Sequence, residues 1–150
     1  MGATRLRRNK GFTLLEILVA LLVLSIGLLG LAGLQTFSLR NNHSALLRSQ
    51  AVVLAYDALD RMRANRDQAM LGAGSVYNSA PPSSAPNCSS NCSSADLAKY
   101  DLVTWTEEVA RLPAGQGQIS IDANNKATVE VEWSDNRDNN TLTIVVETLL

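Results

Sequence analysis

The hydrophobic pattern divides the chain into regions with different periodicities. Residues 12–39 form a nearly continuous apolar block, in which Ile17–Leu39 contains 23 consecutive uncharged residues. As an α-helix this run would be about 35 Å long, enough to cross a hydrocarbon core of about 30 Å. Because apolar residues occur all round the helix, the pattern favours lipid or a helical bundle as its surroundings.

The same helix is predicted to continue through residues 40–72 with an amphipathic pattern. No proline occurs between residues 1 and 80, so nothing in this stretch forces a break. Two rows of apolar residues are expected to form one stripe: Leu39, Leu46 and Val53 in the first row, and Leu47, Leu54, Ala58 and Met62 in the second. Gly72 and Gly74 are expected to end the helix.

The rest of the chain predicts a loop, a short helix and a small sheet. Residues 73–95 are rich in Ser, Pro, Asn and Ala and are expected to add little to a core. Within residues 96–150, Asp96 is expected to cap a helix that runs to about Leu112. Alternating patterns then predict three strands of an antiparallel meander, over residues 118–122, 127–133 and 141–147.

These elements together predict an α+β fold. One apolar face of the small antiparallel sheet needs a cover, and the amphipathic half of the long N-terminal helix is expected to supply it. Residues 40–72 and 96–150 would then form one globular head. Trp105 and Trp133 are interpreted as core or interface aromatics rather than as a ligand platform.

Charge is distributed unevenly along the chain. Of the 13 basic residues, Arg5, Arg7, Arg8 and Lys10 lie in the first ten positions, whereas all 14 acidic residues lie at Glu16 or later. A basic cluster directly before an apolar span predicts a cytoplasmic N-terminus and an exported C-terminal part. Without residues 1–11, nine basic residues face 14 acidic ones, a net charge of −5. Such an acidic body offers no footprint for nucleic acid.

The two cysteines, Cys88 and Cys92, are separated by three residues. In an exported protein they enter an oxidising compartment, where a disulfide persists. A ring this small would stabilise the fold by about 2 kcal/mol at most. A zinc site is disfavoured, because it needs about four ligands and the single histidine, His43, lies far away in sequence.

The junction Lys10-Gly11-Phe12-Thr13-Leu14-Leu15-Glu16 carries the strongest functional signal. Glu16 is hard to explain by burial, because an acidic residue beside a membrane span is costly and usually has a partner. A secretory signal peptide has no use for a glutamate there. The apolar block is also followed by no persuasive cleavage site of small residues, since Gly30-Leu31-Ala32 is a weak match.

This junction resembles the class III signal of type IV prepilins and pseudopilins. The resemblance implies a type IV pilin-like fold and a leader of residues 1–11, which a membrane prepilin peptidase removes after Gly11. The same enzyme would methylate the new terminal amine of Phe12. Glu16 matches the glutamate that attracts the terminal amine of a neighbouring subunit. An amine and a carboxylate that enter an apolar bundle cost much less as a pair than alone.

The longer chain is similar to minor pilins of the PilV type. The similarity rests on Ile26–Gln35, Leu54–Arg66, Trp105, Leu112–Gly115 and Val131–Asp135, and is weakest across residues 73–95. It implies a subunit of low abundance that supports pilus assembly, adhesion or twitching motility. Its implied partners are other minor and major pilins through the N-terminal helix, the inner-membrane assembly platform, membrane lipid and a tip adhesin. The alternative within the family is a minor pseudopilin of a type II secretion system.

Two further features are open to more than one interpretation. The glycines at every third position have three open interpretations: close approach of helices, ordinary tolerance of glycine in a membrane span, or local unwinding of the helix. They are Gly27, Gly30 and Gly33. Residues 61–66 are suggestive of a partner-binding patch, although a solvated helix end is the simpler interpretation. An enzyme is disfavoured, because adjacent Glu107 and Glu108 point about 100° apart on a helix and no phosphate-binding loop is present. No cofactor or metal is expected.

Overall fold

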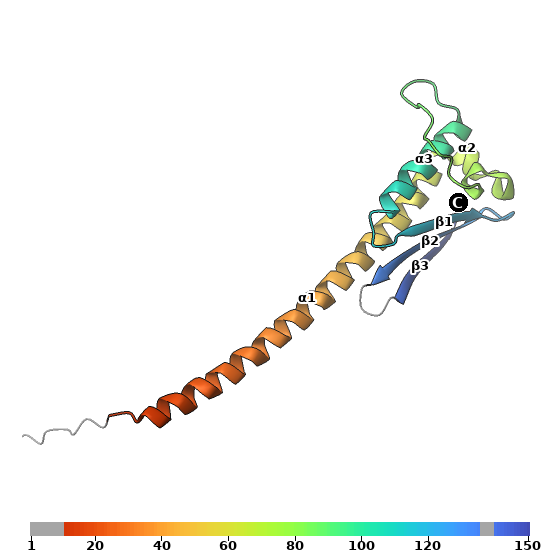
Figure 1. Cartoon of the computed structure of the whole chain (residues 1–150). Helices are drawn as coiled ribbons and strands as arrows, with labels where there is room; N and C mark the ends of the chain where they lie inside the picture. The colour runs from red at the N-terminus through yellow and green to blue at the C-terminus, as the bar shows by residue number, and fades with distance from the viewer. Residues whose placement is uncertain (1–10, 136–139) are drawn as a thin grey trace, which may run out of the picture. The chain divides into compact units, whose positions relative to one another are not determined.

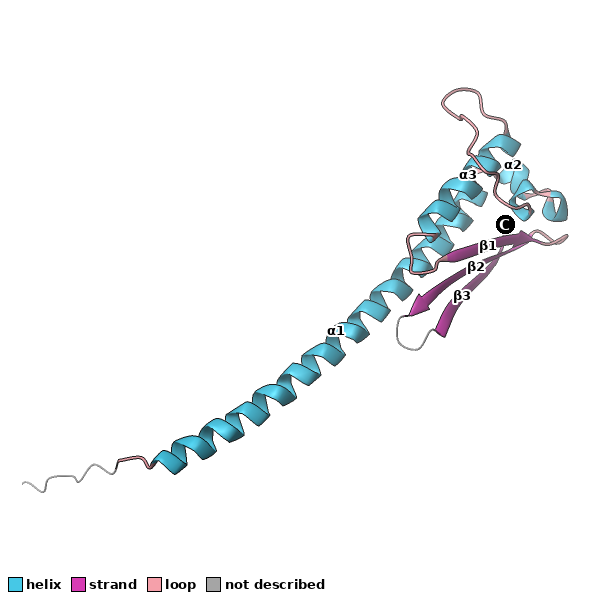
Figure 2. Ribbon diagram, in the orientation of Figure 1, coloured by secondary structure: helices cyan, strands magenta, loops and turns pink. Residues whose placement is uncertain are grey.

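The computed structural model of the chain describes residues 11–135 and 140–150 (Figures 1 and 2). It contains long helix α1 (Leu14–Ala64), short helix α2 (Arg66–Ala69), the 3-10 helices η1 (Gly72–Gly74) and η2 (Val76–Asn78), helix α3 (Ser94–Val109), and strands β1 (Gln116–Ile121), β2 (Lys126–Asp135) and β3 (Asn140–Leu149). Residues up to His43 form one compact unit and Ser44–Leu150 another, and each is described separately. The expected α+β class, with a long N-terminal helix and a three-stranded antiparallel sheet, is confirmed.

The sheet has the strand order β1-β2-β3, with antiparallel pairing throughout, as a meander requires (Figure 2). The central strand β2 alternates as its sequence predicts, because period-two side chains face opposite sides of a sheet. Its inward residues are fully buried and are Ala127, Val129, Val131 and Trp133. Part of the turn expected between β2 and β3, residues 136–139, lies outside the described residues.

The head half of α1 packs on the core through a stripe that differs from the expected one. Leu46 and Val53 are exposed, Val53 by 63%. The buried stripe is Leu47, Ala51, Ala55, Ala58, Leu59 and Met62. Three of these six residues are alanines, so burial here follows the face that is turned to the core cluster rather than side-chain size. The expected stripe was therefore wrong for Leu46 and Val53 of the first row, whereas Leu47, Ala58 and Met62 of the second row are buried.

The long helix also ends earlier than Gly72. Asn65 leaves the helical conformation, with φ −104° and ψ 54°, and separates α1 from α2. Its buried side-chain amide donates hydrogen bonds to the Ser94 carbonyl at 2.7 Å and to the Tyr77 hydroxyl at 3.3 Å. These bonds to distant parts of the head compensate for the interrupted helical ladder. Gly72, with φ +57°, lies in a later turn, where a Cβ would approach the Asp122 carbonyl at 2.9 Å.

Helix α3 starts two residues before the expected cap. Ser93 is the N-cap residue, and its hydroxyl accepts a hydrogen bond from the Asp96 N–H at 3.1 Å. Asp96 is therefore in the first turn, where its charge suits the helix dipole. The helix ends at Val109 rather than near Leu112. Gly115 follows closely, and a Cβ there would collide with the Val109 carbonyl.

Residues 73–95 contribute more to the core than their composition predicts. Tyr77 in η2 is 1% exposed and belongs to the core cluster. Its hydroxyl donates to Asp101 at 2.7 Å, so the polar end of the ring is satisfied inside the head. Trp105 and Trp133 are both buried, which confirms their interpretation as core aromatics.

Candidate functional site

The expected cleavage junction, Gly11-Phe12, precedes the first turn of α1. Gly11 is exposed, and a Cβ built on it would meet nothing within 4 Å. Phe12 is 81% exposed and also lies outside the helix. Among the described residues, no contact therefore requires glycine at position 11, and both residues are accessible.

Thr13 caps the helix that follows. Its hydroxyl and its carbonyl both accept hydrogen bonds from the Glu16 N–H, at 3.3 Å and 3.1 Å. Thr13-x-x-Glu16 has the spacing of a capping box, a signal that the sequence analysis missed. Glu16 lies in the first turn of α1, where a carboxylate also suits the helix dipole. Any assembly role for Glu16 must therefore be separated from a role in capping.

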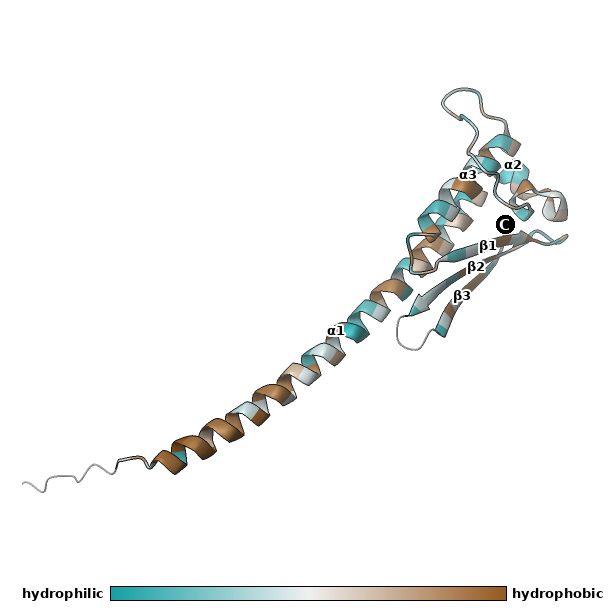
Figure 3. Cartoon of the chain, viewed as in Figure 1, coloured by the Kyte–Doolittle hydropathy of each residue, from teal (hydrophilic) through white to brown (hydrophobic). Residues whose placement is uncertain are grey.

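The apolar half of α1 is exposed along its length (Figure 3). Within the described residues, α1 is long and apolar enough to cross a membrane. At Gly27, Gly30 and Gly33 an added Cβ would meet nothing within 4 Å, so contacts within the chain explain none of the three glycines.

The suggested partner patch at residues 61–66 is not one surface. Met62 and Asn65 are buried, whereas Arg63 and Arg66 are exposed. Arg61 is half-buried and is occupied by contacts with α1 and α3. These residues mainly join α1 to the rest of the head, and the patch interpretation was wrong for Arg61, Met62 and Asn65.

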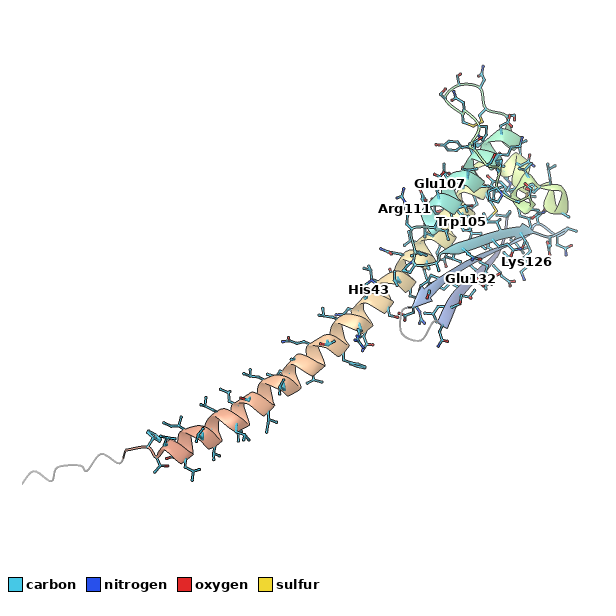
Figure 4. The ribbon with its side chains drawn as sticks, in the orientation of Figure 1. His43, Trp105, Glu107, Arg111, Lys126 and Glu132 are labelled. Atoms are coloured by element: carbon cyan, nitrogen blue, oxygen red, sulfur yellow. A yellow bond between two sulfur atoms is a disulfide. The ribbon has the colours of Figure 1, made fainter. Side chains whose placement is uncertain are left out.

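Arg61 holds the two helices together through several oxygen atoms. Its Nε donates to Asp57 Oδ2 at 2.7 Å, its Nη1 to Thr104 Oγ1 at 2.6 Å and its Nη2 to Glu108 Oε2 at 3.2 Å. Asp101 Oδ1 lies 3.9 Å from Nη1. One guanidinium thus faces three carboxylates, and a planar fork of donors suits such a site better than a lysine would. Glu108 is engaged in this way, while Glu107 on the same helix is exposed (Figure 4).

Asp101 is the most perturbed carboxylate of this cluster. Burial raises its pKa above the ordinary value, the Tyr77 hydroxyl and the Arg61 charge oppose the rise, and the Asp57 charge adds to it. Burial and the hydrogen bond to Asp101 also raise the pKa of Tyr77. The phenol therefore remains a neutral donor at physiological pH.

Asp101 should make the head less stable as the pH rises from acid. Its unfolded pKa is near 3.8 and its folded pKa is higher, so the folded state binds more protons between the two values. The Asp101 contribution to stability must then fall across this window and stay constant above it. Asp101→Asn keeps an oxygen acceptor for Tyr77 and should remove this slope. Chemical denaturation at a series of pH values would show it, and identical pH profiles for both proteins would refute it.

Cys88 and Cys92 are joined by a disulfide in the structure. The bridge closes a tight loop in the segment that precedes α3, and Asn91 within it has a positive φ of 50°. Both cysteines are half-buried. Among the described residues, no group of three or more His, Cys, Asp or Glu side chains could hold a metal ion. His43 is exposed on α1 (Figure 4).

Comparisons with known families agree with this geometry. A model of the prokaryotic N-terminal methylation motif matches residues 6–32, which include the junction and the start of the apolar helix. The chain thus carries a prokaryotic N-terminal methylation motif. A second model, of the type IV pilin Tt1218, matches residues 33–103. The two models together match residues 6–103 and support a type IV pilin. No curated protein and no solved structure matches it.

Proposed function

We propose that this pilin is a minor subunit of the PilV type, which primes assembly of type IV pili or is incorporated in them. The observation that carries the assembly role is the position of Glu16, in the first turn of an exposed apolar helix and four residues after exposed Phe12. The role is structural rather than catalytic. It supports pilus biogenesis, and through it adhesion or twitching motility.

The proposed life cycle follows from the two environments of the chain, which are lipid for the apolar half of α1 and water for the head. The basic leader stays in the cytoplasm, the apolar half of α1 crosses the inner membrane once, and the head lies in the periplasm. Prepilin peptidase cuts after Gly11 and methylates Phe12. The helix then leaves the lipid for the fibre, where helices of other minor and major pilins take the place of the acyl chains. Contacts with the assembly platform and a tip adhesin complete the proposed partners.

Glu16→Ala should be cut normally and remain in the membrane, yet enter pili poorly. Loss of the carboxylate removes the attraction for a neighbouring terminal amine and leaves an apolar span that inserts at least as well. The measurement is the amount of this subunit in sheared pili against inner membranes. Mutant subunit at wild-type levels in the sheared fraction would defeat the assembly role.

Glu16→Gln is the matched control, because Thr13-x-x-Glu16 has the spacing of a capping box and the Thr13 hydroxyl accepts from the Glu16 N–H. Glutamine serves a capping box as glutamate does but carries no charge. If Glu16 acts through its charge, Gln and Ala variants should be equally deficient in pili. If Glu16 acts as part of the cap, the Gln variant should enter pili like the wild type. Uncut protein in either variant would assign Glu16 to processing instead.

A secretion pseudopilus is the competing assignment within the family. A chromosomal deletion separates the two, because loss of a minor pilin should reduce surface pili and twitching while secreted enzymes remain in the medium. If the deletion abolished secretion and left surface pili normal, the chain would be a pseudopilin of the secretion system instead.

A further inference from the structure

The two edges of the sheet differ in how they are covered. At the β1 edge, the Asn78 side chain from η2 pairs with the backbone of Ile121. Its Nδ2 donates to the Ile121 carbonyl at 3.1 Å, and its Oδ1 accepts from the Ile121 N–H at 2.6 Å. Asn78 therefore imitates a neighbouring strand at one end of this edge. Among the strands of the described residues, β3 forms the opposite edge and pairs with β2 alone (Figure 1).

The backbone groups on the free side of β3 can be assigned from bonds at the ends of the ladder. The Asp122 N–H donates to the Lys126 carbonyl, so the backbone groups of Lys126 face β1. The N–H and C=O groups of the next residue, Ala127, therefore point away from β1 and toward β3. The Leu150 N–H donates to the Asn125 carbonyl, so here too an odd-numbered residue on the β2 side bonds to an even-numbered residue on the β3 side. Because groups alternate along a strand, even-numbered residues of β3 bond to β2. Outward N–H and C=O groups belong to Thr141, Thr143, Val145, Glu147 and Leu149.

Among the described residues, one of these outward groups meets a hydrogen-bond partner, since the Leu149 carbonyl accepts from the Thr148 hydroxyl at 3.3 Å. The others lie along an edge whose pairing with β2 is continuous over the ten residues of β3, with no bulge. Unpaired groups in such a row form a template for another strand.

The usual devices that protect an edge are absent from β3. Residues 140–149 contain no proline, lysine, arginine or glycine. Their one charge, Glu147, is neutralised by Lys126 of β2, with Nζ and Oε2 2.7 Å apart. The edge is rich in Thr, Val, Ile and Leu, which favour strand pairing. Val145 is 54% exposed beside the free edge.

The core also remains incompletely covered at this strand. The inward side chains of β3 pack on the core but are only half-buried, in contrast to the fully buried row of β2; they are Leu142, Ile144 and Val146. A further strand at this edge would carry inward apolar side chains beside them and bury their exposed flank.

We propose that the free edge of β3 binds an extended segment of another pilin subunit, which adds a fourth strand to the sheet. The backbone groups themselves select this occupant, because a helix has no free row of N–H and C=O groups to offer. The segment should alternate apolar and small polar residues and carry little charge, since Glu147 already has its counter-ion. The occupant's identity as a pilin of another kind rests on the proposed function, since a minor subunit of low abundance has few second copies beside it, whereas the strand pairing rests on the structure.

The pairing is tested by a photo-crosslinking amino acid at Thr143, in full-length protein in cells that assemble the fibre. Ala123, exposed in the β1–β2 turn, is the control position. The expected result is an adduct from Thr143 to one other pilin, with the linked peptide mapped by mass spectrometry to a non-helical segment. An adduct to a second copy of this chain or to a helix, or equal adducts from Ala123, would overturn the proposal.

Proline substitutions separate edge binding from folding. Val145→Pro removes an outward N–H and leaves the β2–β3 ladder intact, a position where edge strands tolerate proline. The Thr143 adduct should then fall about tenfold, while Val145→Thr, which keeps the N–H, should retain it. Ile144→Pro removes a ladder bond and should reduce the thermal stability of the head much more. An undiminished adduct in correctly folded Val145→Pro overturns the proposal, even if the subunit still enters pili and the proposed function stands.

Discussion

Replacing Gly11 by valine should leave the chain uncut in the membrane. A branched side chain next to the scissile bond stiffens the backbone and obstructs close approach of a peptidase, whereas glycine leaves the peptide open. The structure supports an external reason for this glycine, because no atom of residues 11–135 or 140–150 would meet an added Cβ within 4 Å. Processing should fall to background, and intact-mass measurement should find residues 1–11 still attached. The wild type should begin with N-methyl-Phe12.

Gly27→Val is the matched control for this experiment. It places the same side chain on another glycine of the N-terminal region with equally empty surroundings, but away from the junction. Cutting should be normal in this variant. If Gly11→Val were cut as efficiently as Gly27→Val, the cleavage site would lie elsewhere and Phe12 would lose its assignment as the mature terminus.

Trp105→Ala should cost the head about 3–5 kcal/mol, a typical loss for a large buried aromatic. Trp105 is 1% exposed, and its ring lies against Gly117 so closely that a Cβ there would approach it at 2.5 Å (Figure 4). Its Nε1 donates to the Leu54 carbonyl of α1 at 2.8 Å. One side chain thus joins α1, α3 and β1, as the contacts with Leu54 and Gly117 show. The midpoint of thermal unfolding should fall by roughly 10–25 °C, measured by near-ultraviolet circular dichroism of the detergent-solubilised protein.

Trp105→Phe separates packing from the hydrogen bond. Phenylalanine keeps much of the ring volume and loses the donor, so its effect should be clearly smaller than that of alanine. Tyr56→Ala, on the exposed side of α1, controls for loss of an aromatic residue at the surface. A Trp105→Ala protein that unfolds at the same temperature as Tyr56→Ala would show that the ring does not organise the head.

Two elements were determined by the sequence alone. The length of the apolar run before Arg40 determined the first half of α1, and the alternation of apolar and polar residues determined β2. A run of 23 uncharged residues without proline predicts one continuous helix of membrane-spanning length. Alternating Val129, Val131 and Trp133 can bury one face only as a strand. The junction around Gly11 and Glu16 is likewise local, because a peptidase reads consecutive residues. These features needed no knowledge of contacts between distant parts of the chain.

Tertiary structure decided the features that depend on distant partners. Asn65 ends α1 because Ser94 and Tyr77 meet its side chain, and neither is near it in sequence. The buried stripe of α1 includes three alanines, because the face turned to the core cluster, and not the size of the apolar side chain, decides which residues are covered. The free edge of β3 is also a tertiary property. Any strand can be central or peripheral, and only the order of strands in the sheet leaves one row of backbone groups without a partner strand.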